Sequence, residues 1–281
     1  MIFSKQHELG ISGLALLRNW LIGDETVAKS IIKEIRELTK ETKDKSFVTS
    51  DKVISFDVAD GYKAWANTYD SVPNLLLEVE EPIVKTILKK FIPGTALDAA
   101  CGTGRYSELL NSLDYKVIGM DLSPAMLSQA KKTRNKKINF IEGDLTAIPL
   151  KEASVDLTIC ALALTHLPNM EKALSELKRV IRPGGHIVLS DIHPWLVMLG
   201  GQAEFFDKTG KHGYVLNYVH WHSDYINSFQ RLQLKVIECL EPVMESKHVK
   251  LAQTGFDLKE KTVATALEGL PIALIWVLEK V

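Results

Sequence analysis

Strand-like and helix-like segments alternate in the middle of the chain, and this alternation constrains the fold more than any other feature. Short apolar runs recur at 95–100, 115–121, 138–143, 154–164 and 185–192. The intervals between them carry apolar residues at helical spacing, as in NMEKALSELKRVI. A repeated strand–helix–strand order implies parallel pairing with right-handed crossovers. The sequence therefore predicts an α/β fold with a doubly wound, Rossmann-like sheet, whose ligands bind beyond the carboxyl ends of the strands.

The segments on either side have other patterns. Apolar residues at helical spacing predict one helix over 10–22 and a second that follows Asp24, its expected N-cap. We therefore predict a helical N-terminal appendage over residues 1–60, which could cap an active site or form a dimer contact. After residue 193 the pattern predicts a β-hairpin around 208–210, then a helix and two more strands.

Between the appendage and the sheet, the sequence predicts further helices. Tyr62, Trp65 and Tyr69 recur at positions i, i+3 and i+7, which places three aromatic rings on one helix face. Such a stripe is typical of core packing. The next predicted helix, EPIVKTILKKF, has Pro82 near its start, where proline is tolerated.

The overall composition excludes several classes of protein. A net charge of −1 gives no basic excess of the kind that a nucleic-acid partner would require. No apolar segment is long enough for a membrane helix, and the N-terminal stretch GISGLALL lacks the cleavage site of a signal peptide. Cys101, Cys160 and Cys239 are far apart, which predicts free thiols. We expect a cytoplasmic protein with neither nucleic-acid nor membrane partners.

A glycine turn follows the first strand of the alternation, in ALDAACGTGR (96–105). Gly102 and Gly104 fit the first two glycines of a G-x-G-x-x-G pattern, and Ser107 occupies the third position. Glycine lets a ligand approach the backbone closely. The turn alone does not distinguish a phosphate from another ligand.

Three acidic residues near this turn carry more information. Asp98, Asp121 and Asp144 lie at the ends of three successive predicted strands. A pyrophosphate fits poorly beside three carboxylates. A ligand with an ammonium group, a sulfonium, ribose hydroxyls and an adenine amine fits better, because these groups are cationic or donate hydrogen bonds. The alternative, that each aspartate caps a turn or a helix, remains open.

Residues 95–192 resemble the core of class I S-adenosylmethionine-dependent methyltransferases, in ALDAACGTGRYSELL, VIGMDLSPAMLSQA, INFIEGDLTAIPL and LKRVIRPGGHIVLSD. The resemblance implies a seven-stranded sheet whose last strand, expected over 272–280, is antiparallel. It also implies S-adenosyl-L-methionine as the cofactor. The methyltransferase domain would span 61–281, with lid or entry helices over 61–92 and a substrate-side insertion over 194–232.

The expected cofactor contacts follow from the acids and from this resemblance. Asp121 would bind both ribose hydroxyls, Asp98 the amino group and Asp144 the adenine amine. Arg105 would bind the methionine carboxylate or pair with an acid on the same surface. The full set of expected cofactor-binding residues is Tyr62, Tyr69, Asp98, Cys101, Gly102, Gly104, Arg105, Asp121, Leu122, Met126, Asp144, Leu145, Ala161 and Leu162.

Candidate catalytic residues follow the fourth and fifth predicted strands. The segment LSDIHP places Asp191 and His193 at the end of the fifth strand, and His166 follows the fourth. Histidine titrates near neutral pH and could remove a proton from an acceptor that must lose one. Each also has a structural alternative: Asp191 could satisfy His193 within a turn, and His166 could cap or pack.

The segment VHWHSDY predicts His220 and His222 on one face of a strand, near Asp224. Two such histidines could bind a metal, but the spacing fixes no third ligand, so we predict no metal site. The surrounding aromatic residues predict an aromatic, partly hydrophobic acceptor site. The expected substrate-binding residues are Trp65, Trp195, Tyr218, His220, Trp221 and His222.

These features together predict a methyltransferase that acts on an O, N or C atom of a small molecule. Three alternatives stay open: a protein methyltransferase, a cofactor-binding regulatory protein without chemistry, and a nicotinamide dehydrogenase. The residues do not identify the acceptor, and a homodimer stays an open expectation.

Overall fold

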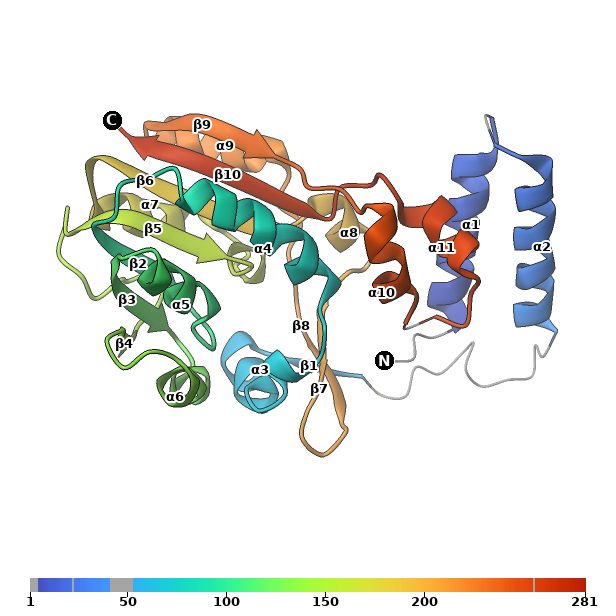
Figure 1. Ribbon diagram of the computed structural model, residues 1–281, viewed down its shortest axis with the longest axis horizontal. Coiled ribbons are helices and arrows are strands. Elements are labelled where there is room, and N and C mark those ends of the chain that lie inside the picture. Colours follow the sequence, from blue (N-terminus) through green and yellow to red (C-terminus); the bar gives the residue numbers. More distant parts are fainter. Residues whose placement is uncertain (1–4, 22, 41–52, 255) are drawn as a thin grey trace. The chain divides into compact units, whose positions relative to one another are not determined.

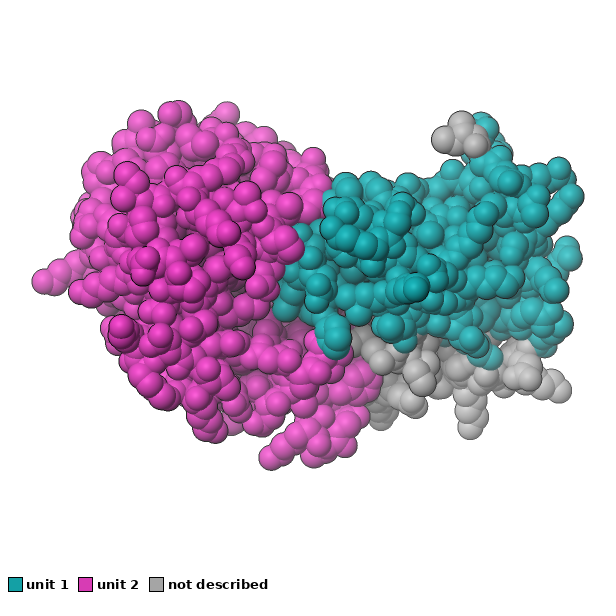
Figure 2. Space-filling view, in the orientation of Figure 1, with its two compact units in different colours: residues 1–53, 73–79, 243–271 teal, residues 54–72, 80–242, 272–281 magenta. Residues whose placement is uncertain are grey.

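The computed structural model describes residues 5–21, 23–40, 53–254 and 256–281. Contacts divide the chain into two compact units (Figure 2). Unit 1 comprises Met1–Val53, Pro73–Val79 and Val243–Pro271, and unit 2 comprises Ile54–Val72, Glu80–Pro242 and Ile272–Val281. Among the described residues, no helix combines the length and apolar character that crossing a membrane requires.

Seven strands of unit 2 form one sheet (Figure 1). They are β2 (Thr95–Ala99), β3 (Lys116–Asp121), β4 (Asn139–Glu142), β5 (Val155–Ala161), β6 (Ile181–Ile192), β9 (Leu234–Leu240) and β10 (Ala273–Lys280). Their order across the sheet is β4-β3-β2-β5-β6-β10-β9. Strand β10 is antiparallel to both of its neighbours, and the remaining pairs are parallel. The predicted doubly wound, seven-stranded sheet with an antiparallel last strand is confirmed.

Helices cover both faces of this sheet. The helices of unit 2 are α3 (Val58–Trp65), α5 (Arg105–Ser112), α6 (Pro124–Thr133), α7 (Glu171–Val180), α8 (Pro194–Met198) and α9 (His222–Arg231). Helix α4 (Leu75–Leu88) begins in unit 1 and continues in unit 2. Figure 1 shows α4 and α5 on one face, and α7 and α9 on the other.

Strict alternation along the strands builds the two cores. In β10, Leu274, Trp276 and Leu278 pack against α7 and α9, whereas Ile275 and Val277 pack with α4, α5 and α6. A period of two residues sends successive side chains to opposite faces of a strand. The central strands therefore read as continuous apolar runs, since both of their faces are buried.

A small second sheet supports the aromatic helix α3. It has the order β1-β8-β7, with β1 at Ile54–Phe56, β7 at Ala203–Phe206 and β8 at His212–Val215. Strands β7 and β8 form the hairpin predicted around residues 208–210. Helix α3 approaches this sheet closely, because a Cβ atom on Gly61 would lie 2.3 Å from Val215.

Unit 1 contains α1 (Lys5–Asn19), α2 (Glu25–Thr39), α10 (Val249–Gln253) and α11 (Glu260–Leu267). Asp24 caps α2 as predicted, since its side chain accepts the Thr26 N–H at 2.6 Å. Arg18 donates from Nη1 to the carbonyl oxygens of Ala266 and Glu268, at the end of α11. The N-terminal helices are therefore confirmed, and a segment near the C-terminus packs with them.

Some details differ from the expectations. Residues 54–60 belong with the sheet unit rather than with the appendage, because β1 pairs with β8. Residues 41–52 of the predicted appendage lie outside the described residues. Pro82 lies inside α4 and not near its start, because the helix begins earlier, where the Asn74 side chain accepts the Leu76 N–H at 2.9 Å.

Candidate functional site

The glycine turn lies at the carboxyl end of β2, beside the point where the strand order reverses between β2 and β5. The φ angles of Ala100, Gly102 and Gly104 are +59°, +55° and +81°. A Cβ atom on Gly104 would lie 3.0 Å from the Phe140 ring, so this glycine is required by packing as well as by φ. A Cβ atom on Gly102 would meet nothing within 4 Å. The backbone at Gly102 is therefore open to a ligand.

Asp121 ties the end of β3 to this turn. Its Oδ2 accepts the Gly102 N–H at 2.7 Å, and its Oδ1 accepts the Ser123 N–H at 2.8 Å. Burial raises the pKa of the Asp121 carboxyl. A carboxylate offers about four lone-pair positions, so two remain for hydroxyl donors after these bonds. We name residues 98–105 and 121–123 together the glycine edge.

The other two predicted acids differ from Asp121. Asp98 is buried and accepts a hydrogen bond from Ser107 Oγ at 2.6 Å, while burial raises its pKa to about 6. Asp144 is exposed, and its Oδ1 accepts the N–H and the hydroxyl of Thr146 at 2.7 and 2.9 Å. Asp144 thus closes a turn of its own, which is the structural alternative to a cofactor contact.

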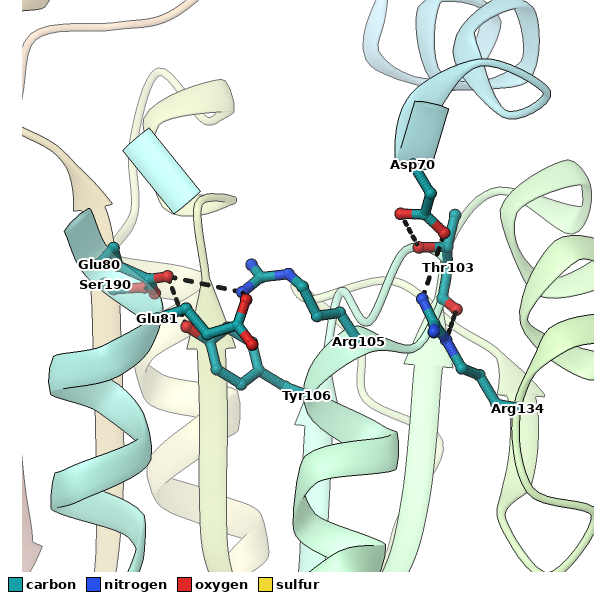
Figure 3. A network of polar contacts seen from close by, with 8 residues as sticks. All are labelled: Asp70, Glu80, Glu81, Thr103, Arg105, Tyr106, Arg134 and Ser190. Carbon is teal, nitrogen blue, oxygen red and sulfur yellow. Dashed lines mark hydrogen bonds and ion pairs between the residues drawn. The ribbon is translucent and has the colours of Figure 1, made fainter. Parts of the chain in front are cut away.

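Arg105 pairs with two acids of α4 (Figure 3). Its Nη1 lies 2.9 Å from Glu81 and 3.7 Å from Glu80. Glu80 is fully buried, accepts hydrogen bonds from Tyr106 Oη and Ser190 Oγ, and has its pKa raised by burial. Of the two roles expected for Arg105, the structure shows the pairing with acids.

A second network holds the turn that follows α3 (Figure 3). Asp70 accepts a hydrogen bond from Thr103 Oγ1 at 3.0 Å and forms an ion pair with Arg134 at 3.2 Å. Arg134 also donates from Nε to the Thr103 carbonyl at 2.9 Å. These contacts fasten the segment around Tyr69 to the glycine edge.

The predicted aromatic stripe forms a cluster of rings. Tyr62 stacks on Trp65 with centroids 5.7 Å apart, and Tyr69 meets Trp65 edge-on at 4.9 Å. Trp65 also stacks on Phe205 of β7 at 5.2 Å. The insertion after residue 193 therefore reaches the cluster through its hairpin.

His166 follows β5, in the short 3₁₀ turn Leu164–His166, and is buried. Its Nδ1 lies 2.9 Å from the Leu216 carbonyl, which fixes the proton on Nδ1. Its Nε2 therefore accepts a hydrogen bond from Tyr62 Oη, at 2.8 Å. Burial lowers the pKa of His166. The neutral imidazole is thus the form that this environment favours.

Asp191 lies among the last residues of β6 and His193 follows the strand, but the two side chains do not bond each other. Asp191 accepts Tyr225 Oη at 2.7 Å and the Thr165 N–H at 3.4 Å, and burial raises its pKa to about 7. His193 Nε2 lies 3.0 Å from Glu241 Oε1, and its Nδ1 accepts the Trp195 N–H at 3.4 Å. We name His166, Asp191 and His193, with their partners Tyr62, Tyr225 and Glu241, the histidine edge.

The expected substrate-binding residues do not gather in one place. Trp65 lies in the ring cluster; Tyr218 and His220 bond the backbone of Thr165 and Leu167; and His222 lies 3.0 Å from Glu241. The prediction that His220 and His222 share a strand face is wrong. Asp224 accepts the Trp221 N–H at 2.8 Å, which starts α9 at His222 and turns the two histidines apart. Trp221 is exposed, and Trp195 lies in α8.

The remaining expected cofactor residues lie around the glycine edge with different exposure. Leu122 is exposed, Leu145 is half-buried and Met126 is fully buried. Cys101 is buried beside the turn. Ala161 ends β5, and Leu162 after it has φ of +56°, a conformation that non-glycine residues rarely adopt. Strained backbone thus flanks the switch point on both sides, at Ala100 and at Leu162.

Comparison with known proteins assigns the family. Residues 97–189 match the family model described as a methyltransferase domain. These residues belong to the class I S-adenosylmethionine-dependent methyltransferases. The malonyl-[acyl-carrier protein] O-methyltransferase of Yersinia pestis is 35% identical over 135 residues, 48% of this chain and 50% of that protein. The demethylmenaquinone methyltransferase of Renibacterium salmoninarum is 38% identical over 105 residues, 37% of this chain and 44% of that protein. The chain spans about half the length of the curated relatives it matches.

Solved structures agree on the fold of the methyltransferase domain. An S-adenosylmethionine-dependent methyltransferase from Mesorhizobium loti has a TM-score of 0.56 at 18% identity, and the match covers 73% of this chain and 99% of that one. A [4+2]-cyclase has the same TM-score, 0.56, at 13% identity, with 81% and 98% covered. One fold therefore carries different reactions, and the reaction must be argued from the site.

Two candidate functional residues of the methyltransferase domain, Glu80 and Glu241, have no recognisable signal in the sequence. Glu80 lies in the segment EVEEPIV, whose charges are typical of a solvated helix face. Glu241 follows β9 without any motif around it. Their partners, Ser190 and His193, are distant in sequence. Only the folded arrangement brings these side chains together.

Proposed function

We propose that this protein binds S-adenosylmethionine at the glycine edge and transfers its methyl group to a small-molecule acceptor. The observation that carries the proposal is the bond from Gly102 N–H to Asp121, in a positive-φ turn at the switch point of a methyltransferase-family sheet. Ligands of such sheets bind at that point. Asp121 retains lone pairs for two ribose hydroxyls, and Gly102 presents open backbone.

The residues around the turn fit this cofactor better than they fit a dinucleotide. Asp98 and Asp121 are carboxylates near the open turn, and they would repel a pyrophosphate. We assign the ribose to Asp121, the amino group to Asp98 and the methionine carboxylate to Arg105. Tyr69 is held beside the turn through Asp70 and Thr103, so its ring can cover the methionine end.

When bound, the cofactor supplies an activated methyl group, and the transfer is an in-line displacement in which positioning provides much of the rate. The protein must then orient the acceptor and, where the acceptor is protonated, remove a proton. His166, Asp191 and His193 are the candidates for that role. Tyr62 links His166 to the ring cluster, which makes a short relay from an acceptor lying against those rings.

The acceptor that we propose is small and partly hydrophobic. Two relatives of this chain are named for a malonyl group on acyl-carrier protein and for demethylmenaquinone. Aromatic rings around α3 would contact the apolar part of such an acceptor. Whether an O, N or C atom receives the methyl group depends on the acceptor.

Two measurements test this proposal. Calorimetry with S-adenosylmethionine, S-adenosylhomocysteine and NAD should show binding of the first two and none of NAD. Binding of NAD alone would make the protein a nicotinamide enzyme. Because the fold also occurs in a cyclase, binding does not establish transfer. The protein should therefore be incubated with methyl-labelled cofactor and fractionated extracts. Label in small molecules supports the proposal, whereas label confined to macromolecules would contradict a free small-molecule acceptor.

A further inference from the structure

A cluster of two histidines and one glutamate lies at the carboxyl edge of the sheet. His193 follows β6, Glu241 follows β9 and His222 begins α9. Strands β6 and β9 run in the same direction on either side of β10, so their carboxyl ends meet at one edge. The backbone of Ile272 joins the two sides, since its carbonyl accepts the His193 N–H and its N–H donates to Pro242.

The three side chains converge on one point. Glu241 Oε1 lies 3.0 Å from Nε2 of His193 and 3.0 Å from Nε2 of His222. All three potential ligand atoms lie within 4.8 Å of one another. In a tetrahedral site with metal–ligand bonds of about 2.0–2.1 Å, ligand atoms are about 3.3 Å apart. The two histidine–glutamate distances of 3.0 Å therefore need to lengthen by only about 0.3 Å to reach that spacing.

We propose that His193, His222 and Glu241 bind a divalent transition-metal ion of the zinc type. Two imidazoles and one carboxylate form a donor set that zinc uses in open sites, where water or a substrate takes the remaining position. The exposure of the side chains fits such a site, because His193 is 9% exposed, His222 35% and Glu241 47%. The ion would have a buried anchor and access from solvent.

The sequence did not reveal this site because its apparent signal was misleading. The H-x-H pair suggested His220 with His222, but His220 Nε2 bonds the Leu167 carbonyl instead. The second histidine and the carboxylate come from other strands. A bound metal would occupy Nε2 of His193, so the metal and a proton-accepting role for His193 exclude each other. Metal binding is measured without cofactor or acceptor. A protein that does not transfer methyl groups could therefore still bind the metal, and the reverse also holds.

Coordination has a structural consequence at α8. With Nε2 of His193 on the metal, its Nδ1 carries the ring proton and can no longer accept the Trp195 N–H that now caps this helix. That contact is long, at 3.4 Å, and its loss costs little. Metal binding should therefore change the environment of Trp195 and its fluorescence.

The test uses the untagged chain of 281 residues, treated with EDTA and then titrated with Zn²⁺ by calorimetry and with Co²⁺ by visible absorption. We expect one ion per chain and the intense bands of tetrahedral Co²⁺. Glu241→Gln and His222→Ala should each weaken binding at least about tenfold, since even the groups that support metal ligands have effects of that size. The absence of binding to the wild type would overturn the proposal.

A matched pair of residues controls for non-specific binding. His212 and Glu204 form a similar contact, with 3.1 Å between Nε2 and Oε2, in the β7–β8 hairpin. His212→Ala and Glu204→Gln should leave Zn²⁺ affinity unchanged, as should Cys239→Ser, which removes the exposed thiol near Glu241. Equal loss of affinity in these variants and in Glu241→Gln would overturn the assignment.

Discussion

The glycine edge and the histidine edge lie side by side at the carboxyl ends of one sheet, but they are built differently. At the glycine edge, the turn, Asp98 and Ser107 come from one stretch of chain, and Asp121 follows on the next strand. At the histidine edge, each pairing joins residues far apart in sequence, such as His166 with Tyr62 and His193 with Glu241. Local sequence therefore determines where the proposed donor binds, and long-range packing determines how the acceptor side is arranged.

Glu80 links the segments next to the two edges, because it accepts hydrogen bonds from Tyr106, which follows the glycine turn, and from Ser190 of β6, which precedes Asp191. Glu80→Ala should lower the free energy of unfolding by about 3 kcal/mol, since it leaves buried partners without an acceptor. Urea unfolding followed by tryptophan fluorescence measures this loss.

Two variants sharpen the Glu80 prediction. Glu80→Gln keeps one carbonyl acceptor and should lose about 1 kcal/mol. Glu81→Gln, which removes the half-exposed partner of Arg105, should lose less than about 1 kcal/mol. If Glu81→Gln lowered the free energy of unfolding as much as Glu80→Ala, the burial of Glu80 would not explain the loss of stability.

Asp98 makes the glycine edge sensitive to pH. Its pKa is raised to about 6 in the folded protein by burial, whereas an unfolded aspartate has a pKa near 3.9. A raised folded-state pKa means that stability is fully present below about pH 4 and falls as pH rises towards about 6, by about 1.4 kcal/mol per pH unit. Asp98→Asn removes this titration.

The difference in unfolding free energy between wild type and Asp98→Asn should therefore move in favour of the variant by about 2 kcal/mol from pH 4 to pH 6. Urea unfolding at intervals across that range measures it. The Ser107 hydroxyl favours the ionised form of Asp98. Ser107→Ala should therefore raise the pKa of Asp98 further, so that the free energy of unfolding continues to fall up to a higher pH than in the wild type. A difference that stays constant with pH would contradict the assignment to Asp98.

Asp121→Ala tests the glycine edge as the cofactor site. The variant should bind S-adenosylmethionine about 1–3 kcal/mol more weakly, as expected for the loss of a charge-assisted hydrogen-bonded group. Calorimetry measures the change, with Asp207→Ala as the control. Asp207 closes the exposed turn of the β7–β8 hairpin, where it accepts the N–H groups of Thr209 and Lys211. Equal affinities of Asp121→Ala and wild type would remove Asp121 from the site.

What the sequence could predict follows the same division between the two edges. The sheet, the antiparallel strand at 272–280, the hairpin at 208–210 and the Asp24 cap all depend on periodicity or on neighbouring residues, and they are confirmed. Pro82 was misplaced because Asn74, several residues earlier, starts the helix. Neither Glu80 nor Glu241 has a local pattern that separates a buried or paired carboxylate from a solvated one.

Tyr62→Phe tests the histidine edge with the smallest expected effect. The Tyr62 hydroxyl donates to the unprotonated Nε2 of His166, so it stabilises the neutral imidazole. Its removal should raise the pKa of His166 and lower the free energy of unfolding by about 1 kcal/mol. The titration of the His166 ring by NMR measures the first effect. Tyr218→Phe is the matched control, since Tyr218 is exposed and bonds Thr165 through its backbone N–H. An unchanged His166 titration in Tyr62→Phe would show that burial, and not the distant tyrosine, keeps this histidine neutral, while the Leu216 carbonyl fixes its proton on Nδ1.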